Sequence, residues 1–144
     1  MSGYVCSFLL IIGAHTWPMF QKDIQHLGRA DVIGPPAPSL LWTFSLGAIS
    51  SSSPVIAEDG TIYIGTTGGF LFAIDPEGNE KWRFSTGTPV NASPVILDNG
   101  DICCATSAGE LINVDASGDE QWRFTASGQF GASSSPIVDG SRIY

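Results

Sequence analysis

Acidic, histidine and cysteine side chains are the residues of this 144-residue sequence whose types could support chemistry. The acidic stretch 98–101 and the pair Asp115 and Asp119 offer oxygen ligands for calcium, but their spacing matches no defined calcium loop and fits turns. His15 and His26 lie far apart in sequence and lack partner ligands for a metal. No nucleophile motif, phosphate-binding glycine loop or catalytic carboxylate pair is recognisable. We therefore predict no catalytic, cofactor-binding or metal-binding residues and no enzymatic activity of the chain's own.

Composition indicates which elements must carry these side chains. Hydrophobic residues make up 43% of the chain and charged residues 14%, which is typical of a folded protein. Seventeen glycines and nine prolines favour short strands joined by tight turns. The net charge of −8 repels polyanions, so we expect no nucleic-acid partner and no binding to an anionic membrane surface. We also expect no integral membrane segment.

A period of forty residues organises the chain. Trp42, Trp82 and Trp122 open similar phrases forty residues apart, and residues 42–81 and 82–121 are identical at 16 of 40 aligned positions. A Ser-Pro dipeptide followed by two β-branched residues recurs at 53–56, 93–96 and 135–138. This self-similarity predicts three structural repeats, 42–81, 82–121 and the partial repeat 122–144.

Each repeat has the pattern of four short antiparallel strands. In the first repeat we predict strands at 53–57, 61–66, 70–75 and 80–85, separated by turns that contain glycine. Residues 70–74 are apolar on both faces, as expected when a small sheet is covered on both sides by its neighbours. The prediction is an all-β fold, a β-propeller of four-stranded antiparallel blades. Closed propellers have about four to eight blades, so about 2.5 repeats predict an incomplete ring and a truncated product or gene-model fragment.

The end of each repeat carries a more specific resemblance. Asp75, Gly78 and Trp82 occur in an order that resembles the tryptophan-docking pattern of PQQ-like (quinoprotein alcohol dehydrogenase-like) repeats, with one residue fewer between aspartate and glycine. In that family the indole packs across the gap between adjacent blades, where a large apolar group with one donor suits both surfaces. The resemblance implies structural blade-docking roles for Trp42, Trp82, Trp122, Asp75, Asp115, Gly78 and Gly118.

The same resemblance gives Cys103 and Cys104 a second interpretation. Some PQQ-dependent alcohol dehydrogenases have a disulfide between adjacent cysteines over the quinone. Here the two cysteines align with Tyr63 and Ile64 in a predicted buried strand, where a disulfide between neighbours would distort the extended backbone. We therefore expect them to pack as small apolar residues.

The N-terminal part precedes the repeats. Residues 4–14 form an apolar run as long as a signal-peptide core and too short to span a bilayer. Residues 1–16 are thus a candidate signal peptide, with a mis-assigned start or a buried N-terminal strand as alternatives, and 17–41 are a leading segment and linker. Residues 41–45 are expected to be an outer strand that closes the ring against the last blade. An export signal would place the protein in the periplasm, at the outer membrane or outside the cell.

Two functional hypotheses follow from the resemblance. The favoured one is a non-enzymatic protein-interaction scaffold, similar to the propeller component of the machinery that assembles outer-membrane barrels. Its partners would be other proteins, the remaining blades of the same propeller, or further copies of itself. The alternative is a fragment of a quinoprotein dehydrogenase that oxidises alcohols or sugars, and PQQ and calcium are expected as cofactors only in that case.

Overall fold

The computed structural model describes residues 5–8, 18–19, 39–126, 134–140 and 142–144. Most of the candidate signal peptide and of the segment 17–41, with both histidines, lies outside these residues. The described residues form twelve strands and no helix. The strands are β1 (Val5–Phe8), β2 (Trp42–Ser45), β3 (Val55–Ile56), β4 (Ile62–Gly65), β5 (Phe70–Ile74), β6 (Glu80–Ser85), β7 (Val95–Ile96), β8 (Ile102–Ala105), β9 (Glu110–Val114), β10 (Glu120–Thr125), β11 (Val138–Asp139) and β12 (Arg142–Ile143).

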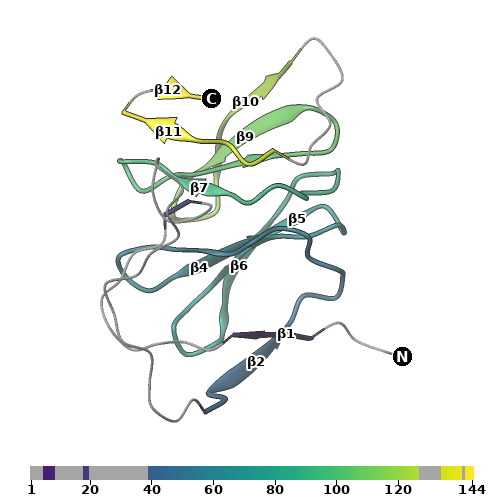
Figure 1. The fold of residues 1–144 in the computed structure, drawn as a ribbon, viewed down its shortest axis with the longest axis vertical. Coiled ribbons are helices and arrows are strands. Elements are labelled where there is room, and N and C mark those ends of the chain that lie inside the picture. Colours follow the sequence, from purple (N-terminus) through teal and green to yellow (C-terminus); the bar gives the residue numbers. More distant parts are fainter. Residues whose placement is uncertain (1–4, 9–17, 20–38, 127–133, 141) are drawn as a thin grey trace.

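Two complete blades form the centre of the molecule. Blade 1 has the strand order β3-β4-β5-β6 and blade 2 has the order β7-β8-β9-β10, and all neighbouring strands are antiparallel. The pairs β1–β2 and β11–β12 are separate two-stranded sheets, and the four sheets stack along the long axis of the molecule (Figure 1). The predicted all-β fold of four-stranded antiparallel blades is confirmed, and with two complete blades the ring is incomplete.

The predicted strands agree with the observed ones to within about two residues. Strand β6 has the predicted bounds, whereas the predicted strand 53–57 shortens to Val55–Ile56. Pro54 explains part of this difference, because proline has no N–H to donate to a neighbouring strand. The turns are tight for the predicted reason, since Gly60 adopts a φ of 81° that favours glycine.

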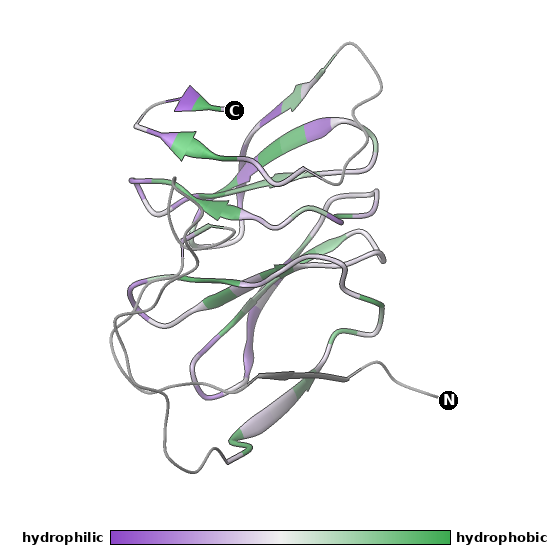
Figure 2. Cartoon of the chain, in the orientation of Figure 1, coloured by the Kyte–Doolittle hydropathy of each residue, from purple (hydrophilic) through white to green (hydrophobic). Residues whose placement is uncertain are grey.

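The hydrophobic core lies between the blades rather than within one. Its largest cluster joins buried residues of blade 1, such as Leu71, to buried residues of blade 2, such as Ile112. All four residues of β4 are buried, because its two faces meet different neighbouring sheets. Figure 2 shows hydrophobic residues along these central strands and hydrophilic ones at several of the turns. Each blade is therefore stabilised by stacking on its neighbours.

Strand β2, which precedes blade 1, pairs with a different strand from the one predicted. The segment 41–45 was expected to pair with the last blade, but β2 pairs with β1. Phe44 and Trp42 pack on the outer face of blade 1, and the rings of Phe44 and Phe72 lie 5.8 Å apart. Part of the N-terminal apolar run is thus in a strand, which sequence patterns could not pair because more than thirty residues separate β1 from β2.

Candidate functional site

Two of the predicted docking tryptophans contact the turn of the following blade. Trp42 Nε1 donates a hydrogen bond of 2.9 Å to Pro76 O, and Trp82 Nε1 donates one of the same length to Ala116 O. The indoles lie against the turn glycines. A Cβ placed on Gly78 would be 2.5 Å from Trp42, and one on Gly118 would be 3.0 Å from Trp82. The structure thus brings each tryptophan together with a glycine of the next blade.

The predicted aspartates shape these turns. Asp75 Oδ1 accepts a 2.8 Å hydrogen bond from the backbone N–H of Asn79, and the Asn79 side chain donates to the same carboxylate. These hydrogen bonds hold the pKa of Asp75 below its usual value. Asp115 Oδ1 likewise accepts from Ser117 N at 2.8 Å. Each carboxylate therefore fixes the turn whose carbonyl receives the indole N–H.

Trp122 lies in a different environment. Its side chain is 39% exposed, and the strand β10 that carries it is exposed along its whole length, whereas Trp82 and Phe84 on β6 are half-buried. The turns that receive Trp42 and Trp82 join the third and fourth strands of a blade, and the described part of the third blade includes only β11 and β12.

A ladder of serines, which the sequence interpretation missed, links successive blades. Ser53 N donates to Ser93 Oγ at 2.9 Å, and Ser93 N donates to Ser135 Oγ at 3.0 Å. All three belong to the recurring Ser-Pro phrase. Their matching positions in the repeat were visible in the sequence, but the direction of their hydroxyls depends on how the blades stack.

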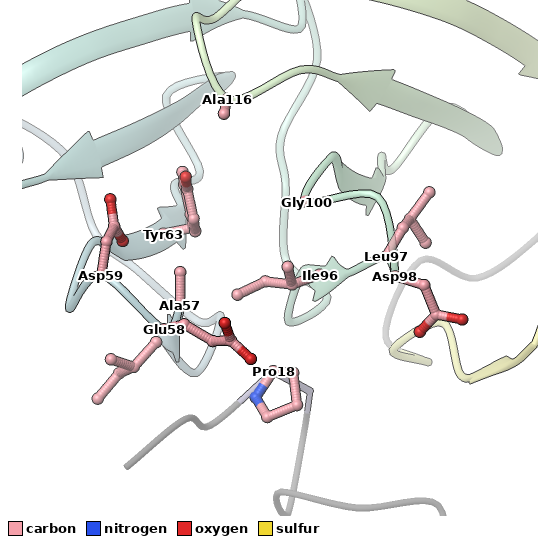
Figure 3. Close-up of a pocket in the computed structure, with 11 residues that line it drawn as sticks. Pro18, Ala57, Glu58, Asp59, Tyr63, Ile96, Leu97, Asp98, Gly100 and Ala116 are labelled. Atoms are coloured by element: carbon pink, nitrogen blue, oxygen red, sulfur yellow. The ribbon is translucent and has the colours of Figure 1, made fainter. Parts of the chain in front are cut away.

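A groove lies between blades 1 and 2. It has a volume of about 490 Å³ and is bounded by the β3–β4 turn and the β7–β8 turn. Figure 3 shows Tyr63 and Ile96 between the two turns, and the acidic residues Glu58, Asp59 and Asp98 on the turns themselves. The groove therefore combines an apolar interior with an acidic rim.

Part of the N-terminal segment already lies in this groove. Pro18 contributes to the lining, and its carbonyl accepts a 2.8 Å hydrogen bond from the backbone N–H of Ile96 on β7. Sequence reasoning placed Pro18 only in a leading segment, because no local pattern indicates a contact across so many residues. The contact shows that a backbone N–H at the edge of β7 can donate a hydrogen bond to the carbonyl of another segment.

Two titratable groups that line the groove have shifted pKa values. Although burial by itself would raise it, hydrogen bonds from Thr61 and Lys81 hold the pKa of Asp59 below its usual value. Burial, with a smaller contribution from Asp59, raises the pKa of Tyr63 to about 12. Tyr63 thus stays protonated near neutral pH, and Asp59 stays ionised.

Asp101, in the acidic stretch 98–101, contacts both its own turn and a neighbouring strand. Asp101 Oδ2 accepts from Asn113 Nδ2 at 2.7 Å and from Asn99 Nδ2 at 2.9 Å. Across the described ranges, no three histidine, cysteine or acidic side chains lie close enough together to hold a metal ion. Nor does any described segment form a helix long and apolar enough to cross a membrane.

Cys103 and Cys104 lie side by side on β8 without a disulfide. Both thiols are free and buried, and burial raises the pKa of each to about 12. They pack into different clusters, Cys104 between the two blades and Cys103 against β11 and β12. The prediction that they pack as apolar residues is confirmed. Because they point to opposite faces of the sheet, they do not fit a disulfide over a quinone.

Comparisons with known proteins agree with this architecture. The family model described as outer membrane protein assembly factor BamB matches residues 28–144. The crystal structure of BamB from Moraxella catarrhalis is similar over 62% of this chain, with a TM-score of 0.57 and 20% sequence identity. That of quinohemoprotein alcohol dehydrogenase from Comamonas testosteroni is similar over 89% of this chain, with a TM-score of 0.74 and 21% identity.

The chain corresponds to only part of each of these proteins. The chain spans 28% of the length of the BamB structure and 22% of that of the dehydrogenase. At these identities the likeness shows the propeller fold alone. No curated protein matches the sequence significantly.

Proposed function

Because the chain belongs to the family described as outer membrane protein assembly factor BamB, we propose that it is an exported, non-enzymatic scaffold that binds an extended segment of a partner protein. The observation that carries this proposal is the contact between Pro18 and Ile96. Pro18 already lies in the groove, and its carbonyl accepts a hydrogen bond from Ile96 N at the edge of β7. The family description, which names an outer-membrane assembly factor, supports export and a protein partner.

The edge of blade 1 offers the partner a second hydrogen-bond donor. Ala57 N, next to Ile56, donates to Thr61 O within blade 1, just as Leu97 N donates to Asp101 O within blade 2. Because N–H groups alternate in direction along a strand, the N–H of Ile56 points away from its own sheet, as that of Ile96 does. An extended partner segment could accept a hydrogen bond from Ile56 N, and from Ile96 N where it displaces Pro18, and this is the β-augmentation mode of peptide recognition.

The acidic residues at the rim of the groove favour a partner with basic side chains. Glu58 and Asp98 are exposed on opposite turns of the groove, and Asp59 has its pKa lowered. Lysine or arginine side chains flanking an apolar stretch would approach these carboxylates. The proposed ligand is therefore an extended peptide with a small apolar centre and basic flanks.

Binding of labelled peptides to the full chain tests this function. We expect a fluorescein-labelled peptide with an apolar centre and lysine flanks to raise its anisotropy on titration with the protein, and its glutamate-flanked counterpart to bind at least tenfold more weakly. The double variant Glu58→Lys, Asp98→Lys should reverse this preference, because it changes the sign of the charge on both sides of the groove.

The matched control is Glu77→Lys. Glu77 is also exposed but lies on the β5–β6 turn and does not line the groove, so this variant should bind like the original chain. Equal binding of the two peptides, or an equal effect of Glu77→Lys, would contradict the proposal. Reduction of an electron-accepting dye by the chain with PQQ, calcium and an alcohol would support the dehydrogenase alternative instead.

A further inference from the structure

Two adjacent residues that precede the repeats lie along the edge of blade 2. The carbonyl of Pro18 accepts a 2.8 Å hydrogen bond from Ile96 N on β7, which is the edge strand in the order β7-β8-β9-β10. Pro18 also lines the groove between blades 1 and 2 (Figure 3). Met19, the next residue, packs against the apolar cluster on the opposite face of blade 2, which contains Val95 and Cys103. The pair therefore reaches both faces of the blade at its edge.

The two side chains alternate as those of an added strand do. Successive residues of an extended segment point to opposite faces of a sheet. On β7, Ile96 packs with the cluster between the blades and Val95 belongs to the cluster on the other face. Pro18 lies on the side of Ile96, and Met19 lies on the side of Val95. The chain's own segment thus meets the edge of blade 2 in the way that β-augmentation describes for a bound peptide.

The edge of blade 1 provides a contrast within the same groove. Ile56 on β3 occupies the place that Ile96 occupies on β7, forty residues later in the sequence. Among the described residues, no segment from outside blade 1 accepts a hydrogen bond from the N–H of Ile56. The chain therefore covers one of the two donors with which we expect a partner to bind.

We propose that Pro18 and Met19 form an internal ligand, which competes with the partner segment for the groove. This inference rests on the proposed function, because it concerns the regulation of the same site. A partner that accepts a hydrogen bond from Ile96 N must first displace the carbonyl of Pro18 and the proline ring from the groove. The measured dissociation constant of the partner is then its intrinsic value divided by the fraction of chains in which the groove is uncovered.

The internal ligand is built to be displaced. Its described contacts are one backbone hydrogen bond, the proline ring in the groove and one partly buried methionine side chain. Proline has no N–H, so Pro18 cannot return a second hydrogen bond to the carbonyl of Ile96. A partner residue with an N–H at the same place can exchange two hydrogen bonds with Ile96 in an antiparallel arrangement. A partner therefore gains a contact that the internal ligand lacks.

The variant Met19→Ser tests the competition in the full chain. Met19 is absent from the lining of the groove, so the substitution loosens the internal ligand without changing the surface that the peptide contacts. It also leaves the charge unchanged. We expect the dissociation constant of the lysine-flanked peptide, measured by anisotropy, to fall about tenfold, because a larger fraction of chains has an uncovered groove.

Hydrogen exchange of single backbone amides gives an independent readout. Without peptide, the Ile96 amide should exchange faster in Met19→Ser than in the original chain, by the same factor by which the dissociation constant falls. Both quantities report the fraction of chains in which Pro18 has left the groove. The Ile56 amide is the internal reference. Its exchange should be the same in both chains, and bound peptide should slow it.

The matched control is Ile143→Ser. Ile143 on β12 packs against the same apolar cluster as Met19, so the variant loses a similar contact without releasing Pro18. Its affinity for the peptide and its Ile96 exchange should equal those of the original chain. Far-UV circular dichroism would verify that both variants keep their sheets.

The outcomes separate the internal ligand from the function of the groove. If the peptide binds the original chain and Met19→Ser equally well, or if Ile143→Ser has the same effect as Met19→Ser, the internal ligand is overturned and the groove function stands. If the peptide binds neither the original chain nor Met19→Ser, both proposals are overturned. Tighter binding without faster exchange of the Ile96 amide would also overturn the internal ligand, since the gain would then have another origin.

Discussion

Two separate constraints favour glycine at position 78, and substitutions can distinguish how much each contributes to stability. Its φ is 90°, and a Cβ would lie 2.5 Å from the indole of Trp42. Gly100 has a similar φ of 85° but nothing within 4 Å of a Cβ. We expect Gly78→Ala to lower the free energy of unfolding by about 1–3 kcal/mol more than Gly100→Ala does, because overpacking adds to the backbone strain. Urea denaturation of both variants measures this difference, and equal losses would mean that the close contact with Trp42 contributes nothing.

Asp75 should contribute to stability only while it is ionised. Its folded pKa lies below the ordinary value of 3.8, chiefly through the hydrogen bond from Asn79 N. A lowered folded pKa gives stability that is fully present above the ordinary value and is lost as the pH falls through the folded pKa. We expect Asp75→Asn to unfold with a shallower pH dependence below about pH 4. Denaturant melts across that range test this, and parallel curves for the two proteins would contradict it.

Among the elements, β6 and β10 provide a matched pair of docking strands. Trp82 on β6 donates to Ala116 O, whereas Trp122 on β10 is 39% exposed and has no described docking turn. We expect Trp82→Phe to lower the free energy of unfolding by about 1–2 kcal/mol, through loss of the hydrogen bond and of packed area. Trp122→Phe should cost less than about 0.5 kcal/mol, as is typical of exposed positions. Similar losses for the two variants, measured by chemical denaturation, would show that the docking contact is not what stabilises the interface.

The strands within each blade could be predicted because their signals are local. Glycine turns bound each strand, and the apolar residues of 70–74 indicate burial on both faces. The partner of β2 could not be predicted, since its pairing with β1 depends on contacts across more than thirty residues. The short strand β3 was overestimated because the Ser-Pro phrase looks extended in sequence, although Pro54 cannot donate to a sheet.

The site was less predictable than the fold, because it is assembled from separate repeats. The acidic residues at 58, 59 and 98 were interpreted as turn residues, which they are, but their common position around one groove depends on how two blades stack. The serine ladder was missed for the same reason. Equal spacing in a repeat predicts that residues occupy equivalent positions, and only the stacking shows what each position faces.

At the scale of the whole molecule, the net charge of −8 should help attract a basic peptide to the acidic groove. Salt screens this attraction, so we expect the dissociation constant of the lysine-flanked peptide to rise between about 20 and about 500 mM NaCl. Anisotropy titrations at several salt concentrations measure this trend, and a dissociation constant that does not change with salt would contradict the assignment of a basic ligand.

The docking of each tryptophan on the next blade also has a mechanical consequence. Blades 1 and 2 contact each other through the indole of Trp82, through the hydrogen bond between Ser53 and Ser93, and through a shared apolar core. Because the contacts of a repeat protein join neighbouring repeats, tension applied to the two ends of the chain should detach the blades one after another. Each detachment would release a repeat of forty residues, and at about 3.3–3.6 Å per residue it would lengthen the tether by about 13–14 nm. The forty-residue repeat length would then determine the step size in a force–extension curve of unfolding.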